Sequence, residues 1–357
     1  MFLPGLELSR AFYAEAVAPL LDGLVHTAAR VGSGSEVLGF DTERSADHEW
    51  GPRLQVFLSP TDAGRAAEIS TMLAERLPRT FRGWSTHFAE TDDPGIGHMS
   101  TTDGPVDHRV EITDLGSWLV SRLAFDPRAG IDLLDWLATP TQALTEVTAG
   151  AVFHDGLGEL EPVRAALRWY PPDVWRHALA CQWARIAEEE AFVGRCGEVG
   201  DELGSAVVAA RLTRDLIRLC LLIAREYPPY SKWLGSAFAR IPVATTLTPH
   251  LRATLAATDW PARETHLAAA YETVARLQNT TRLPDGTPLC ADVDPATRPY
   301  HSRPFQVIMA GRFTDALRAA ITDPEVQALP LTGTADQHLD NTNLLTKPDH
   351  VRKRWRQ

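Results

Sequence analysis

The chain has 357 residues, of which 44% are hydrophobic and 23% are charged, and this balance excludes a disordered or fibrous protein. Its 35 Lys and Arg residues against 46 Asp and Glu residues give a formal net charge of −11. Because a general nucleic-acid binder normally carries a basic face, this charge argues against a polynucleotide partner.

No segment of the sequence predicts membrane insertion or export. The longest apolar stretches, such as Leu219–Ala224, are far shorter than the ~20 residues that a membrane-spanning helix needs. The N-terminus lacks a basic region followed by an apolar core and a cleavage site, so we expect a cytoplasmic protein. The four cysteines stand far apart without a Cys-x-x-Cys motif, which favours reduced thiols over disulfides or a zinc site.

The first 140 residues alternate between helical and strand-like patterns. Apolar residues at mixed three- and four-residue spacings predict a helix over residues 6–29, or two helices broken near Pro19. An acidic start and a proline after the end predict a helix at Asp62–Leu77. Alternating apolar residues predict strands at Arg53–Leu58, residues 84–88 and residues 108–112. This order of elements favours a mixed sheet with flanking helices.

After about residue 140 the pattern becomes helical almost throughout. Paired prolines at positions 171–172 suit the start of a helix, and those at positions 228–229 must end one. Long helices are therefore expected over residues 171–193, 200–227, 260–280 and 303–321. We predict an α+β protein with two domains, a mixed-sheet domain over residues 1–140 and a helical domain over 141–357 that closes over a ligand.

Two features between residues 31 and 58 are typical of a site that binds phosphate and a metal ion. The run Gly32-Ser33-Gly34-Ser35 can form a turn with unpaired backbone N–H groups, which attract phosphate. If Asp47-His48-Glu49 is extended, both carboxylates project from the same side, because strand side chains alternate. Carboxylate oxygens in such a pair suit Mg²⁺. Either feature by itself is common, as a plain turn or as a solvated strand edge.

Together, in this order, the two features resemble the signature of the nucleotidyltransferase superfamily of the polymerase-beta type. That signature is an apolar residue, Gly-Ser or Gly-Gly, and then Asp-x-Asp or Asp-x-Glu leading into a strand. Val31–Ser35, Gly39 and Asp47-x-Glu49 match it in order. Most of the chain, including residues 185–205 and 230–234, is also similar to an uncharacterised bacterial family, described as a domain of unknown function within that superfamily.

The resemblance implies a third carboxylate on a later strand between apolar neighbours. Glu111, in Val110-Glu111-Ile112, fits this description, and Asp107 on the same face is the alternative. The chain departs from the pattern at Glu49, where aspartate is commoner, and at Trp50, where an aliphatic residue is usual.

The activity that the resemblance implies is magnesium-dependent transfer of a nucleoside monophosphate from a nucleoside triphosphate to an acceptor, with release of pyrophosphate. The acceptor would be a hydroxyl or amine of a small molecule or a protein. Gly34 and Ser35 would hold the β and γ phosphates, and Asp47, Glu49 and Glu111 would bind one or two Mg²⁺ ions. Glu111 would alternatively accept the proton of the acceptor.

The helical part of the sequence carries a stripe of charge at Arg211, Arg214, Asp215 and Arg218, with three- and four-residue spacing typical of one helix face. By analogy with related small-molecule nucleotidyltransferases, Lys232 would supply the cation for the triphosphate. A snorkelling surface lysine is the alternative interpretation of Lys232.

Two further functions compete with the small-molecule or protein nucleotidyltransferase. One is an RNA-end nucleotidyltransferase, which the acidic charge balance disfavours. The other is a catalytically silent, nucleotide-binding regulatory protein, which the unusual Glu49-Trp50 pair suggests. The sequence leaves the acceptor, the preferred triphosphate and the oligomeric state open.

Overall fold

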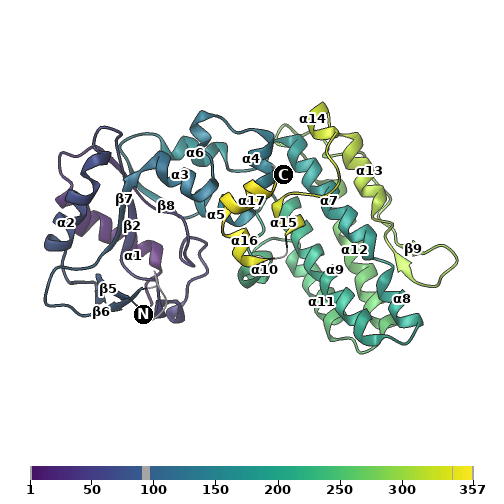
Figure 1. Cartoon of the computed structure of the whole chain (residues 1–357). Coiled ribbons are helices and arrows are strands. Elements are labelled where there is room, and N and C mark those ends of the chain that lie inside the picture. The colour runs from purple at the N-terminus through teal and green to yellow at the C-terminus, as the bar shows by residue number, and fades with distance from the viewer. Residues whose placement is uncertain (1, 91–96, 340, 356–357) are drawn as a thin grey trace. The chain divides into compact units, whose positions relative to one another are not determined.

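The computed structural model describes residues 2–90, 97–339 and 341–355, except for the side chains of residues 47, 343, 354 and 355. The chain divides into two compact units (Figure 1). Unit 1 comprises Met1–Ile131, Ala143–Arg168 and Thr346–Gln357, and unit 2 comprises Asp132–Gln142 and Trp169–Leu345. No helix within the described ranges is long and apolar enough to cross a membrane.

A four-stranded mixed sheet forms the centre of unit 1, in the order β7-β2-β1-β8. Its strands are β1 (His26–Arg30), β2 (Arg53–Leu58), β7 (Arg109–Asp114) and β8 (Ala151–Asp155). β2 and β7 are parallel, whereas β1 is antiparallel to both β2 and β8. The α+β class and the strand at Arg53–Leu58 are therefore confirmed.

Helices and short hairpins surround this sheet. The helices are α1 (Gly5–Phe12), α2 (Ala66–Arg76), α3 (Leu115–Leu123), α5 (Thr141–Thr148), α6 (Leu160–Ala166) and α17 (Pro348–Trp355). The short strands are β3 (Thr80–Phe81), β4 (Trp84–Ser85), β5 (His87–Glu90) and β6 (Gly97–Ser100). Five short turns of 3-10 or π helix lie at Tyr13–Val17, Ala18–Leu20, Glu43–Asp47, Ala63–Arg65 and Pro127–Ala129.

The two faces of the sheet differ in character. On one face, Leu54 and Val56 of β2 join a buried apolar cluster with Leu8 of α1, Leu73 of α2 and Val110 of β7. Since strand side chains alternate, the intervening residues of β2 and β7 point to the opposite face. There Phe57 packs against Trp118 of α3, with ring centroids 5.4 Å apart. The first face is thus a hydrophobic core, and the second leaves room for polar side chains.

The structure corrects the predicted helix over residues 6–29. Regular α-helix ends at Phe12, irregular helical turns continue to Leu20, and residues 26–30 form β1. Gly23, with φ 78°, reverses the chain where a helix would have to continue. The last residues of this segment form a strand because they pair with β2 and β8. Those partners are distant in sequence, so the amphipathic spacing of the segment does not reveal the pairing.

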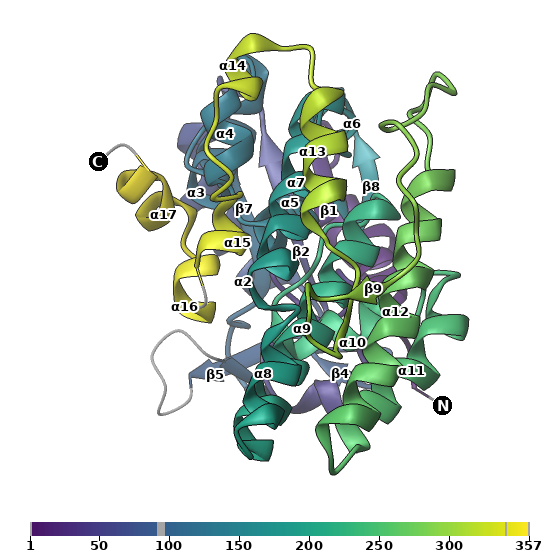
Figure 2. The same ribbon diagram turned by 90° about the vertical axis from the view of Figure 1, so that its right-hand side faces the viewer.

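Unit 2 is mostly helical, and in it α9 packs against both α7 and α12 (Figure 2). These three helices span Pro172–Glu189, Glu202–Ile223 and Trp260–Thr280. The other helices are α4 (Leu133–Ala138), α8 (Phe192–Glu198), α10 (Ser231–Phe238), α11 (Ala244–Ala256), α13 (Gly311–Ala319), α14 (Pro324–Gln327), α15 (Ala335–His338) and α16 (Thr342–Leu345). A two-stranded hairpin joins β9 (Arg298–Pro299) and β10 (Gln306–Val307).

The division into units differs from the predicted boundary at residue 140. Residues 143–168 belong to unit 1, because β8 returns the chain to the sheet and pairs with β1. The C-terminal residues 346–357 belong to unit 1 as well, and there Arg352 lies over the ring of Phe125, 5.5 Å from its centroid.

The end of α7 is joined to the start of α13 by one buried carboxylate. Glu190 accepts hydrogen bonds from the backbone N–H groups of Ile308, Met309 and Ala310, at 2.8, 3.0 and 2.9 Å. Burial raises the pKa of Glu190 to about 7, and the three N–H groups oppose that shift. The carboxylate satisfies backbone donors that would otherwise be buried without acceptors.

We predict that Glu190→Gln lowers the free energy of unfolding by about 1–3 kcal/mol, because the amide nitrogen cannot accept a hydrogen bond from these donors. Urea denaturation measures the change. The matched control is Glu188→Gln, at an exposed position on the same helix, and it should stay within about 0.5 kcal/mol of wild type. Equal stability of the two variants would contradict the role given to Glu190.

The core of unit 2 also contains a buried imidazole. His177 is 3% exposed, and its Nε2 lies 3.4 Å from Sγ of Cys181. Burial, together with the positive charge of Arg318, lowers the pKa of His177 to about 4. The folded protein therefore holds this imidazole neutral at pH values at which the unfolded chain protonates it.

Because the folded pKa of His177 lies below the ordinary value near ~6.5, the free energy of unfolding should fall as pH drops from about 6.5 to about 4. The contribution of this residue is at most about 3 kcal/mol. Denaturation of wild type and His177→Gln across this range tests it. The variant should show a flatter pH dependence, whereas His301→Gln, at an exposed position, should keep that of wild type. Parallel curves for wild type and His177→Gln would refute the assignment.

Candidate functional site

The Gly-Ser loop follows β1 directly and is held from inside by Arg30. This fully buried guanidinium donates to the carbonyls of Val31 and Ser33, both at 2.6 Å, and to Oε1 of Glu36 at 2.6 and 2.8 Å. Gly34 has φ 149°, and a side chain there would collide with Arg30 and Glu36. The loop conformation therefore requires both the buried ion pair and a glycine.

With its carbonyls turned towards Arg30, the loop has free N–H groups. Gly32 donates to the carbonyl of Glu146 at 2.7 Å. Within the described residues, the N–H groups of Ser33, Gly34 and Ser35 form no hydrogen bond. A run of unpaired N–H groups in a glycine-rich turn can bind an anion.

A cavity of about 360 Å³ opens beside this loop on the face of the sheet opposite the apolar core. It is lined by Ser33, Glu49, Arg53, Gln55, His108, Arg109, Val110, Glu111 and Arg122. The parallel register of β2 and β7 explains the composition of this lining. Arg53 stands opposite Arg109 and Gln55 opposite Glu111, so four polar side chains share one face. Here the structure brings the loop, Glu49 and Glu111 together.

The backbone around Glu49 differs from the extended conformation that the sequence predicts. Asp47 ends a 3-10 turn, Glu49 has φ 45°, and β2 begins only at Arg53. The expectation of an extended Asp47-His48-Glu49 segment is therefore wrong. The carboxylate of Glu49 accepts from the N–H of Gly97 at 2.7 Å and lies 3.2 Å from Arg53 and 3.6 Å from Arg109. The side chain of Asp47 lies outside the described residues.

Glu111 is connected to the Gly-Ser loop through Gln55. The amide nitrogen of Gln55 donates to Oε2 of Glu111 at 3.1 Å, and its amide oxygen accepts from the N–H of Val31 at 3.1 Å. Asp107, the alternative third carboxylate, precedes β7, is 55% exposed, and is not part of the cavity lining. Of the two candidates, Glu111 is the one that lies with the loop and Glu49.

Three arginines line the same cavity, and the sequence analysis did not single them out. Burial and the nearby charge of Arg30 lower the pKa of Arg53 to about 10, which leaves its guanidinium charged at neutral pH. Arg53 also donates to the carbonyl of Ser33 at 3.3 Å. Arg122 of α3 lies against Gly32, over the ring of Trp118, and its buried Nε has no hydrogen-bond partner in the described part of the chain. The three arginines that line the cavity outnumber its two carboxylates, Glu49 and Glu111. The net charge of the lining therefore favours an anionic ligand.

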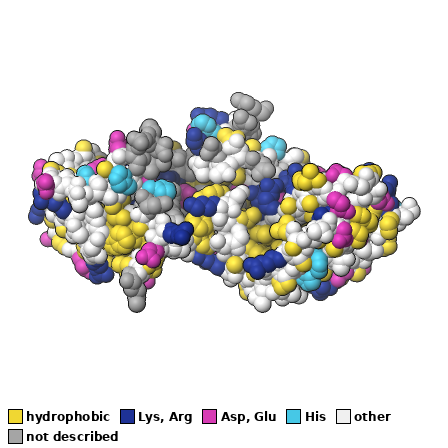
Figure 3. Space-filling view, turned by 90° about the horizontal axis from the view of Figure 1, so that it is seen from below, with side chains coloured by type: hydrophobic (Ala, Val, Ile, Leu, Met, Phe, Trp, Pro, Cys, Tyr) yellow, Lys and Arg dark blue, Asp and Glu magenta, His cyan; other side chains and the backbone are white. Residues whose placement is uncertain are grey.

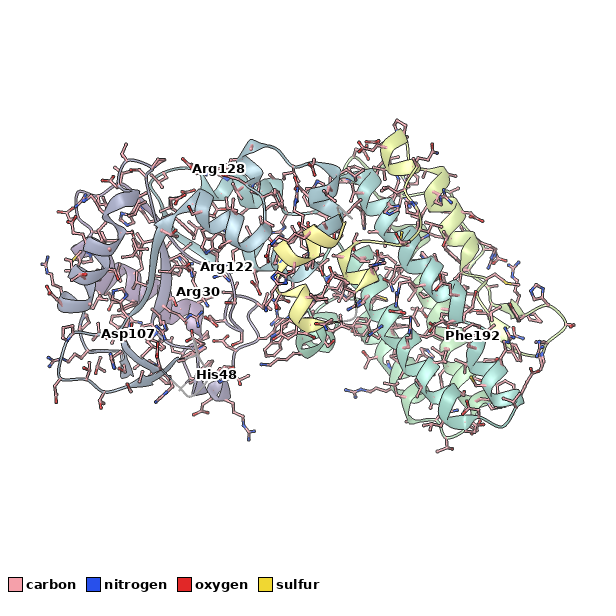
Figure 4. The ribbon with its side chains drawn as sticks, viewed as in Figure 1. Arg30, His48, Asp107, Arg122, Arg128 and Phe192 are labelled. Atoms are coloured by element: carbon pink, nitrogen blue, oxygen red, sulfur yellow. The ribbon has the colours of Figure 1, made fainter. Side chains whose placement is uncertain are left out.

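The alternation of polar residues along β2 and β7 was the signal that could have revealed these residues. Arg53 and Gln55 are separated by Leu54, and Arg109 and Glu111 by Val110. Figure 4 labels Arg30 and Arg122, whose labels lie close together in that view, and Asp107.

Two other predicted residues lie elsewhere. Lys232 is exposed in the first turn of α10 in unit 2, with its Nζ 4.8 Å from the ring centroid of Trp233. Trp50, where the sequence departs from the nucleotidyltransferase signature, is 2% exposed, stacks on Phe2 and donates to Asp41 at 3.1 Å. Trp50 is therefore a core residue.

The described side chains, which do not include that of Asp47, contain no group of three or more His, Cys, Asp or Glu residues arranged to hold a metal ion. The carboxylates that line the cavity are Glu49 and Glu111. On the molecular face drawn in Figure 3, Lys and Arg side chains form separate groups among apolar and neutral surface.

Residues 136–234 match the model of a family described as a domain of unknown function (DUF4037). The matched segment includes α7, α9 and Lys232, and it excludes the Gly-Ser loop and all the residues that line the cavity. No curated protein and no solved structure shows significant similarity to this chain.

The loop conformation depends on a buried ion pair, since Arg30 is fully buried and Glu36 is 2% exposed. We predict that Arg30→Met lowers the free energy of unfolding by about 3–5 kcal/mol, because it removes the closest partner of the buried Glu36 and leaves only the more distant Arg53, at 3.8 Å. The double variant Arg30→Met/Glu36→Leu should be more stable than Arg30→Met alone. Guanidinium denaturation measures these differences.

The matched control is Arg128→Met in the same unit, labelled in Figure 4. Arg128 pairs with Asp126 at 2.7 Å but is 35% exposed, so its loss should cost at most about 1 kcal/mol. If Arg30→Met were no more destabilising than Arg128→Met, the ion pair could not be what fixes the loop.

Proposed function

We propose that this protein is a magnesium-dependent nucleotidyltransferase. It would move a nucleoside monophosphate from a nucleoside triphosphate to a hydroxyl or amine of a small molecule or protein, releasing pyrophosphate. The observation that carries the proposal is that Glu49, Glu111 and Ser33 of the Gly-Ser loop, which are far apart in the sequence, border one cavity. The nucleotidyltransferase-like character of the fold is part of the same proposal.

The cavity suits the phosphates of the donor. The free N–H groups of Ser33, Gly34 and Ser35 would bind phosphate oxygens. Arg122, whose guanidinium lies beside the loop, would add charge-assisted hydrogen bonds. Binding and orienting the triphosphate supplies much of what this reaction needs, since phosphoryl transfer depends mainly on positioning and charge stabilisation.

The chemistry of the carboxylates fits a magnesium ion. Glu49 and Glu111 offer hard oxygen ligands at the cavity, and Asp47 stands two residues before Glu49. When bound there, Mg²⁺ would neutralise charge that develops at the α phosphorus. Arg53 and Arg109, which pair with Glu49 in this structure, would turn towards phosphate oxygens as the donor enters.

Glu111 is our candidate for the group that takes the proton of the acceptor. Its carboxylate is hydrogen-bonded by Gln55 through one oxygen, which orients it and leaves the other oxygen for a proton. As the acceptor oxygen or nitrogen bonds to the α phosphorus, the bond to the pyrophosphate oxygen breaks. The proton passes to Glu111, and pyrophosphate leaves.

The second candidate function is nucleotide binding without transfer. The contacts of Glu49 favour it, because both carboxylate oxygens already have partners in Gly97, Arg53 and Arg109. A carboxylate committed to those partners would bind no metal, while the loop and Arg122 would still hold phosphate.

Calorimetric titration of the full chain with ATP, GTP, CTP and UTP, each with and without Mg²⁺, tests the proposal. We expect saturable binding of a triphosphate that depends on Mg²⁺ in wild type and is lost in Asp47→Ala. Arg122→Gln should weaken binding by about tenfold, the effect of losing one charge-assisted contact. Failure of wild type to bind any of these triphosphates would refute both candidate functions.

Pyrophosphate release in a screen of hydroxyl and amine acceptors separates the two candidates. Glu111→Gln should lose about a hundredfold or more of turnover, as expected for a general base. Asp107→Asn, which changes the carboxylate outside the cavity, is the matched control and should keep wild-type turnover. Triphosphate binding with no pyrophosphate released would favour the silent, nucleotide-binding protein.

A further inference from the structure

Exposed apolar side chains gather where α8 ends and α9 begins. Within the described residues, seven large apolar side chains are exposed, and four of them lie between residues 192 and 207. Phe192, labelled in Figure 4, starts α8 and is 39% exposed. Val199, Leu203 and Val207, which we call the apolar stripe, are 80%, 78% and 62% exposed. Single exposed apolar residues are ordinary on a protein surface, whereas a group of them indicates an interaction surface.

The apolar stripe lies on the side of α9 that is turned away from the rest of unit 2. Leu203 and Val207 are one turn apart and therefore share one side of the helix. Ser205, Ala209 and Leu212 are buried on the side where α9 packs against its neighbouring helices. Beside the stripe, Gly204 and Ala206 are half-buried and Ala210 is exposed. Because these neighbours are small, a second helix can approach α9 closely along the stripe.

The two ends of the apolar stripe carry opposite charges. At the beginning of α9, the carboxylate of Asp201 accepts from the N–H of Gly204 at 2.7 Å and forms no ion pair within the described part of the chain. Two turns beyond Leu203, Arg211 is 48% exposed and pairs with Glu189 at 3.1 Å. A helix face that begins negative and ends positive is complementary to a copy of itself that runs in the opposite direction.

We propose that the apolar stripe is the contact between two copies of this chain, whose α9 helices lie antiparallel about a two-fold axis near residue 205. Residues at equal distances before and after 205 then face each other, so that Leu203 of one copy packs against Val207 of the other. Arg211 of each copy comes beside Val199 and Asp201 of the other copy. Its aliphatic stem covers the valine, and its guanidinium approaches the aspartate.

The charge near the apolar stripe fits a second copy of the chain better than a lipid surface. Helices that lie on membranes flank their apolar residues with Lys and Arg, which attract anionic headgroups. Here Glu198, Asp201 and Glu202 stand at the start of the stripe, and the whole chain has a formal net charge of −11. Anionic headgroups would repel such a surface.

The contact residues all belong to unit 2, so the contact does not depend on the proposed nucleotidyltransferase activity. Sedimentation equilibrium of the full chain between about 1 and 200 μM tests it. For wild type, we expect the mass to rise with concentration from one chain to two. Leu203→Glu/Val207→Glu should raise the dissociation constant of the dimer by about a hundredfold or more, because it places four carboxylates in the contact.

The matched control for this double variant is Leu255→Glu, at a 57% exposed position on α11 of the same unit. It should change the dissociation constant by less than about twofold. Because the substituted side chains are all exposed, urea denaturation should show that each variant folds like wild type.

A charge reversal tests the antiparallel arrangement. Arg211→Glu would face Asp201 of the other copy with a like charge and should weaken the dimer by about tenfold. Arg252→Glu, at an exposed position on α11, makes the same change in net charge and should leave the dimer unchanged. Equal dissociation constants for these two variants would overturn the arrangement.

Three results would overturn the contact itself. One is a mass of a single chain for wild type at every concentration. The second is a dimer that Leu203→Glu/Val207→Glu does not weaken, because it would use another face. The third is a monomeric wild type that binds vesicles of phosphatidylserine and phosphatidylcholine through the stripe. None of these measurements contains a nucleotide or magnesium, so they are distinct from a failure of the nucleotidyltransferase proposal.

Discussion

The buried pairing of Arg30 with Glu36 is the constraint on which the candidate site in unit 1 depends. Arg30 is the last residue of β1, so its position is fixed by the sheet, and its guanidinium binds two carbonyls of the loop that follows. A peptide group whose C=O points inward presents its N–H elsewhere. The Ser33 carbonyl bound by Arg30 belongs to the same peptide group as the N–H of Gly34, so the buried arginine leaves that N–H directed away from it. Gly34 is needed because nothing larger fits over that arginine.

The parallel pairing of β2 with β7 supplies the rest of the site. With Gln55 opposite Glu111, the side chains of alternate residues on the two strands form polar rows on one face, while Leu54 and Val110 enter the apolar core on the other. Gln55 then joins the backbone of the loop to Glu111 through its two amide atoms. One strand register thus places a carboxylate, two arginines and an amide beside the Gly-Ser loop. A slip of one residue would send all of them into the core.

The two units treat buried charge in different ways. In unit 1, Arg30 and Glu36 pair closely, and in unit 2 Glu190 is matched by three backbone donors, so both carboxylates have structural partners. A carboxylate buried by folding is thus compensated by a side-chain cation in unit 1 and by backbone N–H groups in unit 2.

The sequence by itself determined the α+β class, the strand at β2, and the long helices α7, α9 and α12 of unit 2. It also grouped glycine, serine and carboxylates near residues 31–49 as the region of interest. The predicted helix over residues 303–321 was wrong in its first part, because residues 306–307 form β10 and α13 begins only at Gly311. These depend on local periodicity and on turn residues, which act over a few positions. Only the tertiary structure decided that residues 26–30 form a strand, that β8 returns to the first unit, and that Glu111 rather than Asp107 joins the loop. It also revealed Arg53, Arg109 and Arg122 at the cavity. The physical reason is that strand pairing and the burial of charge are settled between residues far apart in the chain, and local pattern contains no information about such partners.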